Sequence, residues 1–230
     1  MRNGSIVKTI VIVGASSGLG KSLALLLHKK GAKLFLLSRK INQVNFLRER
    51  IEKIPCDMTQ PKSIKLAFKK LEEKTKRIDV FVNCVGIALE ERLDHSSERK
   101  IENVIRTNLT GAILANREVY RRMLKQRSGH IINISSTSGK KARPLETVYC
   151  ASKWGLAGFS ESLRLEAREY GIRVSTVYPG GMKTLFYSTY PKKDIKSFMD
   201  PDDVAEQIVC LISSNPNITP SELVIERSRN

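Results

Sequence analysis

The most informative segment for the fold of this chain is Ile6-Val-Lys-Thr-Ile-Val-Ile-Val13-Gly14-Ala-Ser-Ser-Gly18-Leu-Gly20. Residues 6–13 form an apolar, β-branched run, interrupted by Lys8 and Thr9, that is typical of a buried strand. A glycine-rich turn follows, and residues 21–30 carry leucine and alanine at helical spacing. This order favours a bound phosphate, because the first N–H groups of such a helix point at an anion and glycine permits its close approach. The expected contacts are Gly14, Ser16, Ser17, Gly18, Leu19 and Gly20.

Outward from this unit, strand-like and helical stretches alternate along all 230 residues. We expect further strands at 33–38, ending near 54–56, and at 80–85, 130–135, 172–177 and 223–225. We expect further helices at 42–50, 61–76, 96–124, 146–170 and 202–213. Such alternation predicts an α/β fold in a single domain over residues 1–230, with a doubly wound parallel sheet and helices on both faces. Ligands of such a sheet bind beyond the carboxyl ends of the strands, where six polar or turn residues fall: Gly14, Ser38, Asp57, Asn83, Ser136 and Pro179.

Tyr149 and Lys153 lie four residues apart in a stretch that we expect to be helical, so their side chains project from the same face. A phenol has an ordinary pKa of about 10, which is too high for ready proton exchange near neutrality. A neighbouring positive charge lowers that pKa. A pair with this spacing is by itself most often an ordinary solvated helix face, so its interpretation depends on the other motifs.

Six motifs occur along the chain in a fixed order. They are Gly14-x-x-x-Gly18-x-Gly20, Asn83 in Asn-Cys-Val-Gly, Asn108, Ser136, Tyr149-x-x-x-Lys153 and Pro179-Gly180. In order and spacing they resemble the short-chain dehydrogenase/reductase family from about Val7 to Thr184, with a plain helix and strand pattern after that. The resemblance implies a Rossmann-type sheet and an enzyme that interconverts a carbonyl compound and an alcohol by hydride transfer.

The resemblance also implies the catalytic residues, which are Asn108, Ser136, Tyr149 and Lys153. Tyr149 would be the general acid or base, Lys153 would lower its pKa and contact the nicotinamide ribose, and Ser136 would hydrogen-bond the carbonyl oxygen. Asn108 would hold a water molecule that links Lys153 to solvent. Ser135 is an alternative to Ser136, but the spacing to Tyr149 favours Ser136.

The cofactor is expected to be NADP(H) in preference to NAD(H). Ser38-Arg39-Lys40 stands where an NAD-preferring site usually has an acidic residue, and the guanidinium of Arg39 can hydrogen-bond a 2′-phosphate. The alternatives are a solvated basic turn for Arg39 and a helix cap or turn for Asp57, which occupies the place from which the family contacts the adenine ring. The remaining cofactor contacts implied by the resemblance are Met58, Asn83, Tyr149, Lys153, Pro179, Gly180 and Thr184.

Two features depart from the family pattern. Cys84 and Val85 stand where Asn and Ala are usual, from which we expect different packing without loss of cofactor binding. The ending at 222–230 lacks the Asp-Gly-Gly of many tetrameric members, which puts a tetramer in doubt. A homodimer through the helices at 96–124 and 146–170 is the expected assembly.

The substrate is expected to be a small or medium ketone, aldehyde or 3-oxoacyl compound. Residues 185–200 would form a lid, and Arg143 and Glu146 would also face the substrate. The alternative is that the lid side chains only pack it onto the domain. Those side chains are apolar or aromatic at Leu185, Phe186, Tyr187, Tyr190, Ile195 and Phe198, and basic at Lys192, Lys193 and Lys196.

The composition of the chain argues against several other classes of function. The net charge of +17 is spread over the helices without a cluster of stacking aromatics, so nucleic-acid binding is not expected, although anionic ligands should be attracted. The sequence shows no membrane span, no signal peptide and no metal-ligand spacing among its four cysteines, which agrees with a cytoplasmic protein. A non-catalytic NADP(H) sensor on the same fold is the alternative function, but such proteins tend to lose the Tyr and Lys that this chain keeps.

Overall fold

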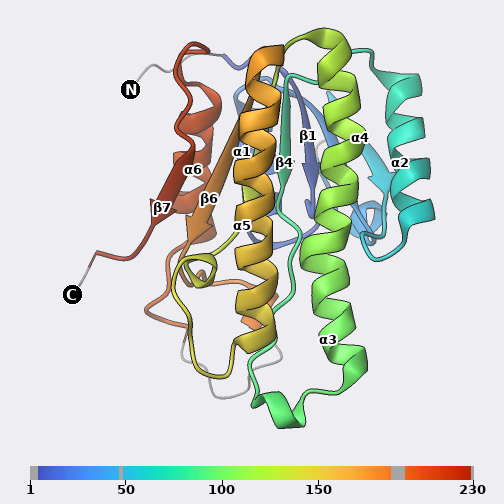
Figure 1. Cartoon of the computed structure of the whole chain (residues 1–230). Helices are drawn as coiled ribbons and strands as arrows, with labels where there is room; N and C mark the ends of the chain where they lie inside the picture. Colours follow the sequence, from blue (N-terminus) through green and yellow to red (C-terminus); the bar gives the residue numbers. More distant parts are fainter. Residues whose placement is uncertain (1–4, 47–48, 188–194, 229–230) are drawn as a thin grey trace.

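A parallel sheet forms the centre of the molecule (Figure 1). The computed structural model describes residues 5–46, 49–187 and 195–228. Within them the strand order is β3-β2-β1-β4-β5-β6-β7, and every neighbouring pair is parallel. The predicted Rossmann-type α/β fold is therefore confirmed. The strands are β1 (Thr9–Val13), β2 (Lys33–Ser38), β3 (Ile51–Pro55), β4 (Val80–Asn83), β5 (Gly129–Ile134), β6 (Ile172–Pro179) and β7 (Glu222–Ile225).

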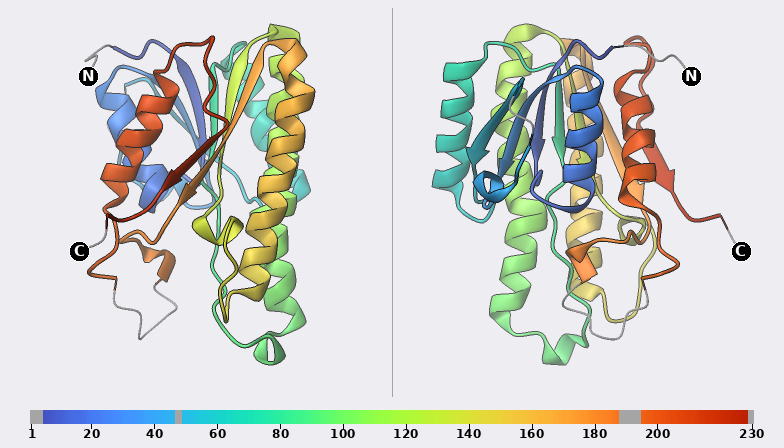
Figure 2. Two further views of the ribbon diagram at one scale, coloured as in Figure 1. Left: turned by 60° about the vertical axis from the view of Figure 1, so that its left-hand side comes forward. Right: turned by 180° about the vertical axis from the view of Figure 1, so that it is seen from behind.

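Helices cover both faces of the sheet (Figure 2). On one face pack α1 (Gly18–Lys29) and α6 (Pro201–Ile212), and on the other α2 (Pro61–Lys74), α4 (Gly111–Gln126) and α5 (Thr147–Ala167). Along β1, Ile10 and Ile12 pack on the first face and Val11 and Val13 on the second. Burial on both faces explains why β1 is a continuous apolar run rather than an alternating one.

The order of the strands reverses at β1, which pairs with β2 on one side and with β4 on the other. Val13 is in register with Asn83, so the turns that follow β1 and β4 lie next to each other. A reversal of this kind leaves a crevice at the carboxyl ends of the strands, because the two connections leave toward opposite faces. The fold therefore brings the glycine-rich turn and the segment after Asn83 to one place.

Several predicted boundaries differ from the structure. The helix expected at 42–50 is wrong: a 3₁₀ turn spans only Ile41–Gln43, and Arg50 has a left-handed backbone with φ of 61°. The helix expected at 96–124 is divided into α3 (Glu98–Ile105), a π-helical turn (Arg106–Thr110) and α4. The π turn ends at Gly111, where a Cβ would collide with the carbonyl oxygen of Met58. The π turn is therefore followed by a residue in close contact with the loop after β3. The helical pattern of the sequence does not show this contact.

No helix in the described part of the chain combines the length and the apolar character needed to cross a membrane.

Candidate active site

The glycine-rich turn has the backbone geometry that its sequence predicts. Gly14 has φ of 84°, and a Cβ there would lie 3.0 Å from the carbonyl carbon of Cys84 and 3.0 Å from the nitrogen of Val85. Gly18 opens α1 with φ of 49°. The N-cap residue Ser17 makes no side-chain capping bond, and the first turn of α1 carries no acidic residue. The N–H groups of that turn are therefore left for an anionic ligand.

A cavity of about 740 Å³ opens beside this turn. We call it the larger cavity. It is lined by every predicted cofactor contact except Asn83, namely Gly14, Ser16, Ser17, Gly18, Leu19, Gly20, Ser38, Arg39, Asp57, Met58, Tyr149, Lys153, Pro179, Gly180 and Thr184. The sequence reasoning missed other residues of its wall, among them Thr59, Gly86, Ile87 and Thr107.

The far end of the larger cavity suits a dinucleotide. The hydroxyl of Ser38 is buried there without a hydrogen-bond partner among the described residues, next to the exposed side chains of Arg39 and Lys40. A buried hydroxyl without a partner is unfavourable until a ligand bonds to it. Asp57 lines the cavity, and its Oδ1 accepts bonds from the nitrogen and hydroxyl of Thr59 at 2.9 and 2.8 Å, which is the turn role that the sequence left as an alternative.

The two predicted asparagines lie behind the larger cavity rather than in its wall. Asn108 is fully buried in the π turn; its Oδ1 accepts from the nitrogen of Ile87 at 2.8 Å, and its Nδ2 donates to the oxygen of Ile87 at 2.9 Å and to Ser152 at 3.0 Å. Asn83 is also fully buried, and its Oδ1 accepts from the nitrogen of Val85 at 3.3 Å. Both side chains therefore hold the segment after β4 in the shape that forms the cavity wall.

Lys153 is buried beside the phenol ring of Tyr149. Its side chain lies on α5 one turn after Tyr149, with Nζ 5.9 Å from the ring centroid and 3.0 Å from the carbonyl oxygen of Ile134, to which it donates. Burial lowers the pKa of the Lys153 ammonium to about 8 from its ordinary value of 10.5. Lys153 is therefore still mainly charged at neutral pH, and its ammonium lies beside the phenol ring of Tyr149.

The two neighbouring serines, Ser135 and Ser136, have different environments in the structure. Ser135 donates its hydroxyl to the carbonyl oxygen of Lys153 at 3.0 Å and is 3% exposed. Ser136 is less buried, and its Oγ accepts a bond from the nitrogen of Ser138 at 3.1 Å, so that it can still donate its proton to a ligand. The geometry favours Ser136 as the residue that contacts a ligand, in agreement with its spacing from Tyr149.

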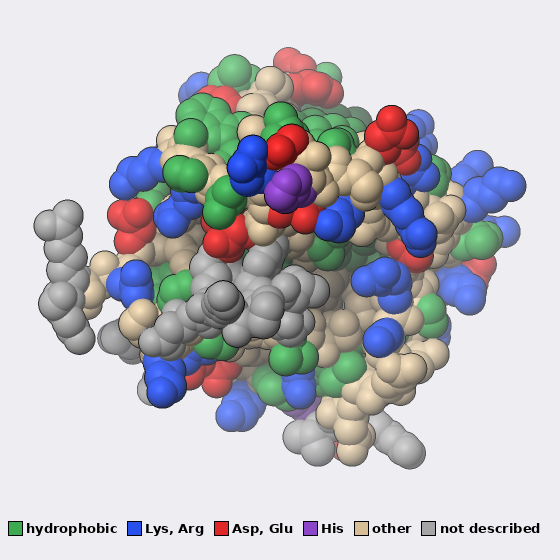
Figure 3. Space-filling model, turned by 90° about the horizontal axis from the view of Figure 1, so that it is seen from below, with side chains coloured by type: hydrophobic (Ala, Val, Ile, Leu, Met, Phe, Trp, Pro, Cys, Tyr) green, Lys and Arg blue, Asp and Glu red, His purple; other side chains and the backbone are tan. Residues whose placement is uncertain are grey.

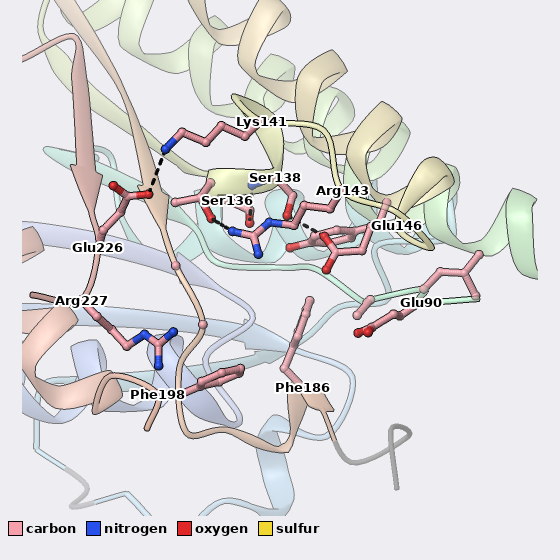
Figure 4. A pocket seen from close by; sticks show the side chains of 16 residues that line it. Glu90, Ser136, Ser138, Lys141, Arg143, Glu146, Phe186, Phe198, Glu226 and Arg227 are labelled. Carbon is pink, nitrogen blue, oxygen red and sulfur yellow. Dashed lines mark hydrogen bonds and ion pairs between the residues drawn. The ribbon is translucent and has the colours of Figure 1, made fainter. Parts of the chain in front are cut away.

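A second cavity, of about 330 Å³, is shown in Figure 4. It shares Ser136 and Tyr149 with the first one, together with Ala88, Gly180 and Phe186. We call it the smaller cavity. Phe186 stands edge-on to Tyr149, with ring centroids 5.9 Å apart, and Phe198 lies further along the wall. Six charged side chains complete it: Glu90, Lys141, Arg143, Glu146, Glu226 and Arg227. Of these the sequence pointed to Arg143 and Glu146; nothing in the local sequence marks the C-terminal pair, Glu226 and Arg227.

The predicted lid is only partly within the described residues. Residues 188–194 lie outside them, which includes Tyr190, Lys192 and Lys193, as does the side chain of Tyr187. Phe186 and Phe198, from the two flanks of this segment, line the smaller cavity as expected. Figure 3 views the molecule from the carboxyl ends of the strands and shows many Lys and Arg side chains on this face, with Asp and Glu among them.

Two further kinds of side chain bear on the chemistry of this arrangement, namely possible metal ligands and cysteines. No group of three His, Cys, Asp or Glu side chains suitable for a metal occurs within residues 5–46, 49–187 and 195–228. Cys56 and Cys84 both line the larger cavity, and burial raises the pKa of each thiol to about 12. Both thiols therefore stay protonated at neutral pH and are poor nucleophiles.

Comparison with known proteins identifies the family of this chain. The family model described as short chain dehydrogenase matches residues 8–194. This chain belongs to the short-chain dehydrogenase family. Its general class is that of an oxidoreductase.

Individual relatives cover nearly the whole chain. Carbonyl reductase family member 4 of Xenopus laevis is 31% identical over 228 residues, which span 95% of this chain and 96% of the relative. Among solved structures, ElxO with NADP bound is 27% identical with a TM-score of 0.86, covering 96% of this chain and 97% of that one. A variant of actinorhodin polyketide ketoreductase with NADPH is 27% identical with a TM-score of 0.85, covering 95% of both chains.

Proposed function

We propose that this protein is an NADP(H)-dependent oxidoreductase that interconverts a carbonyl compound and an alcohol, with Tyr149 as the general acid or base. The observation that carries the proposal is the junction of the two cavities at Ser136 and Tyr149. Hydride transfer requires the cofactor and the substrate to meet, and this junction is the place where ligands in both cavities would touch. The bound nicotinamide would supply or accept the hydride.

The chain's own residues would provide the proton and stabilise the charge. The Tyr149 phenol would donate its proton to the carbonyl oxygen during reduction, and the hydroxyl of Ser136 would donate a hydrogen bond to the same oxygen. Lys153, charged and buried beside Tyr149, would lower the pKa of the phenol so that it gives its proton to the carbonyl oxygen more readily. Asn108 would hold the water that resupplies this proton, since its Oδ1 uses one acceptor position on Ile87 and keeps a second.

The preference for NADP(H) is part of the same proposal. Arg39 and Lys40 follow β2 at the edge of the larger cavity, and the hydroxyl of Ser38 lies beside them. A 2′-phosphate would find two cations there and no acidic side chain at the end of β2, and the guanidinium of Arg39 can bond to it with two donors. The two solved relatives described above were obtained with NADP and NADPH.

A homodimer through the outer face of α5 is also part of the proposal. Trp154 and Leu165 are 51% and 60% exposed, and their spacing puts them on the same side of the helix. Gly158 lies between them, where a Cβ would meet no heavy atom within 4 Å. Two exposed apolar side chains with a glycine between them favour close approach of a second helix. Sedimentation of Trp154→Glu, expected to be monomeric, would test it; an unchanged mass would contradict it.

The test of the activity follows NADPH oxidation against a panel of ketones and aldehydes. Wild-type protein should turn over at least one of them, and Tyr149→Phe should lower kcat by about 10²–10⁴-fold, the usual contribution of general acid catalysis. NADPH should still bind to the variant, because the phenol is not its main contact. Tyr170→Phe is the matched control, since Tyr170 lies outside both cavities. Turnover that survives loss of the Tyr149 hydroxyl would contradict the mechanism.

A further inference from the structure

The cations of the smaller cavity differ in what they bind within the protein. Lys141 lies 3.6 Å from the carboxylate of Glu226. Arg227 donates to the carbonyl oxygen and hydroxyl of Ser197 at 2.9 and 2.7 Å, and its guanidinium carbon lies 5.6 Å from the ring centroid of Phe198. Both side chains therefore already have partners that the fold supplies.

Arg143 has a single neutral partner. Its Nη2 donates to the hydroxyl of Thr137 at 3.2 Å, and no carboxylate among the described residues lies within 4.0 Å of it. The nearby Glu146 instead accepts a bond from the hydroxyl of Ser138 at 2.7 Å. A guanidinium has five N–H donors in a planar fork, so most of the bonding capacity of Arg143 is unused by the protein.

The place of Arg143 matches a part of the substrate close to the reacting carbonyl. Thr137, which orients the guanidinium, is the neighbour of Ser136, and Figure 4 shows the guanidinium directed into the cavity on the side of Ser136. Phe186 and Phe198 supply an apolar wall in the same cavity. A ligand with a carbonyl at Tyr149, a short carbon body on the rings and an anionic end at Arg143 would satisfy all three features.

We propose that the substrate carries a carboxylate that Arg143 binds with two parallel hydrogen bonds, which makes this protein an oxo acid reductase or hydroxy acid dehydrogenase. This rests on the proposed function. An oxo acid, NADPH and a proton would give the hydroxy acid and NADP⁺: hydride adds to the carbonyl carbon, Tyr149 supplies the proton to its oxygen, and the carboxylate is unchanged. The cavity holds three cations and three carboxylates, so its own charge is balanced. The substrate carboxylate would therefore be bound by the guanidinium of Arg143 itself rather than by a net positive charge of the cavity. The net charge of +17 would still favour arrival of an anion.

The experiment compares each oxo acid with its methyl ester, beginning with levulinate and methyl levulinate and extending to shorter and longer carbonyl-to-carboxylate spacings. Wild-type protein should prefer the best acid over its ester by about 10- to 100-fold in kcat/KM, the range expected for charge-assisted hydrogen bonds. Arg143→Ala should remove this preference, because kcat/KM for the acid should fall by about 10- to 100-fold and kcat/KM for the ester should fall far less. Arg143→Lys should restore part of it, because an ammonium keeps the charge without the fork.

The control variant is Arg117→Ala, which removes an equal charge from the surface of α4, outside both cavities. It should keep the full preference for the acid. Equal use of acid and ester by wild-type protein, or an equal loss of both in Arg143→Ala, would overturn the proposal while the proposed function stands. Absence of turnover with every carbonyl compound, neutral ketones included, would contradict the proposed function and this proposal together.

Discussion

The two cavities that meet at Tyr149 are built in different ways. The larger is formed mostly by residues that directly follow strands and by the backbone of a glycine turn. Nearly all of the predicted cofactor contacts line it. The smaller is formed by charged and aromatic side chains from loops, from the flanks of the lid and from the C-terminal segment. A cavity whose shape is set by the backbone suits a ligand that many proteins share. A cavity whose shape is set by side chains can acquire a different ligand when those side chains are substituted. Substitutions in the two cavities should therefore have separable effects.

Lys153→Met should have the strongest effect, since Lys153 lies beside Tyr149, a residue that lines both cavities. Without the ammonium, the pKa of the Tyr149 phenol rises and proton transfer fails, so we expect kcat to fall by about 10²–10⁴-fold. Lys125→Met, at an exposed position of α4, is the matched control and should leave kcat unchanged. Comparable loss in both variants would show a general effect of removing charge rather than a role beside Tyr149.

The same variant should change the pH dependence of stability. The pKa of Lys153 is about 8 when folded and 10.5 ordinarily, so between these values the unfolded chain binds more protons and stability rises with pH. Below about pH 8 Lys153 is charged in the folded protein, and its destabilising contribution to the free energy of unfolding is then at its largest. Denaturant unfolding should therefore find Lys153→Met more stable than wild type at pH 7, with the difference shrinking toward pH 10.5. A difference independent of pH would contradict a buried, charged Lys153.

Gly14→Ala tests the larger cavity alone. At φ of 84° a side chain is strained, and the new Cβ would press on the backbone of Cys84 and Val85 at 3.0 Å. A strain of about 1–3 kcal/mol corresponds to roughly 5- to 150-fold weaker cofactor binding, measured by titration calorimetry with NADPH. Gly158→Ala adds the same methyl group where it meets nothing within 4 Å and should leave affinity unchanged. Unaltered affinity in Gly14→Ala would mean that the turn does not hold the cofactor.

Arg39→Ala should separate the two cofactors. Loss of the guanidinium removes charge-assisted bonds to a 2′-phosphate, so we expect the KM for NADPH to rise about tenfold and the KM for NADH to change little. Lys21→Ala, which removes an equal charge from an exposed position of α1, is the control. An equal change in both KM values would contradict the preference for NADP(H).

Arg227→Ala should have the smallest effect, confined to the smaller cavity. Its bonds to Ser197 lie at the surface, where such contacts contribute about 0–1 kcal/mol. We expect a change of less than about fivefold in the KM for the carbonyl substrate and none in the affinity for NADPH. Steady-state kinetics with both ligands varied checks this. An effect on NADPH binding would show that the two cavities are not separable.

The sequence predicted the parts of the site that depend on local structure. Gly14 and Gly18 follow a strand and open a helix, and the spacing of Tyr149 and Lys153 sets their common face within one turn of α5. It was less informative where distant segments decide the conformation, as at the π turn, whose asparagine Asn108 bonds to Ile87 and Ser152. The helix expected at 42–50 is wrong for a related reason, since Lys53 of β3 donates to the carbonyl oxygen of Val44, just after the 3₁₀ turn Ile41–Gln43.

Local sequence is enough to predict the alternating fold, the glycine-rich turn and the Tyr149–Lys153 pair, because strand burial, glycine backbone freedom and helical spacing act over a few neighbouring residues. Tertiary packing brings Glu226 and Arg227 to the smaller cavity and places Asn83 and Asn108 behind the larger one. It also leaves Arg143 without a carboxylate partner among the described residues. These facts follow from contacts between residues far apart in the chain. Their partners are chosen by the packing of whole elements, which leaves no periodic pattern in the sequence.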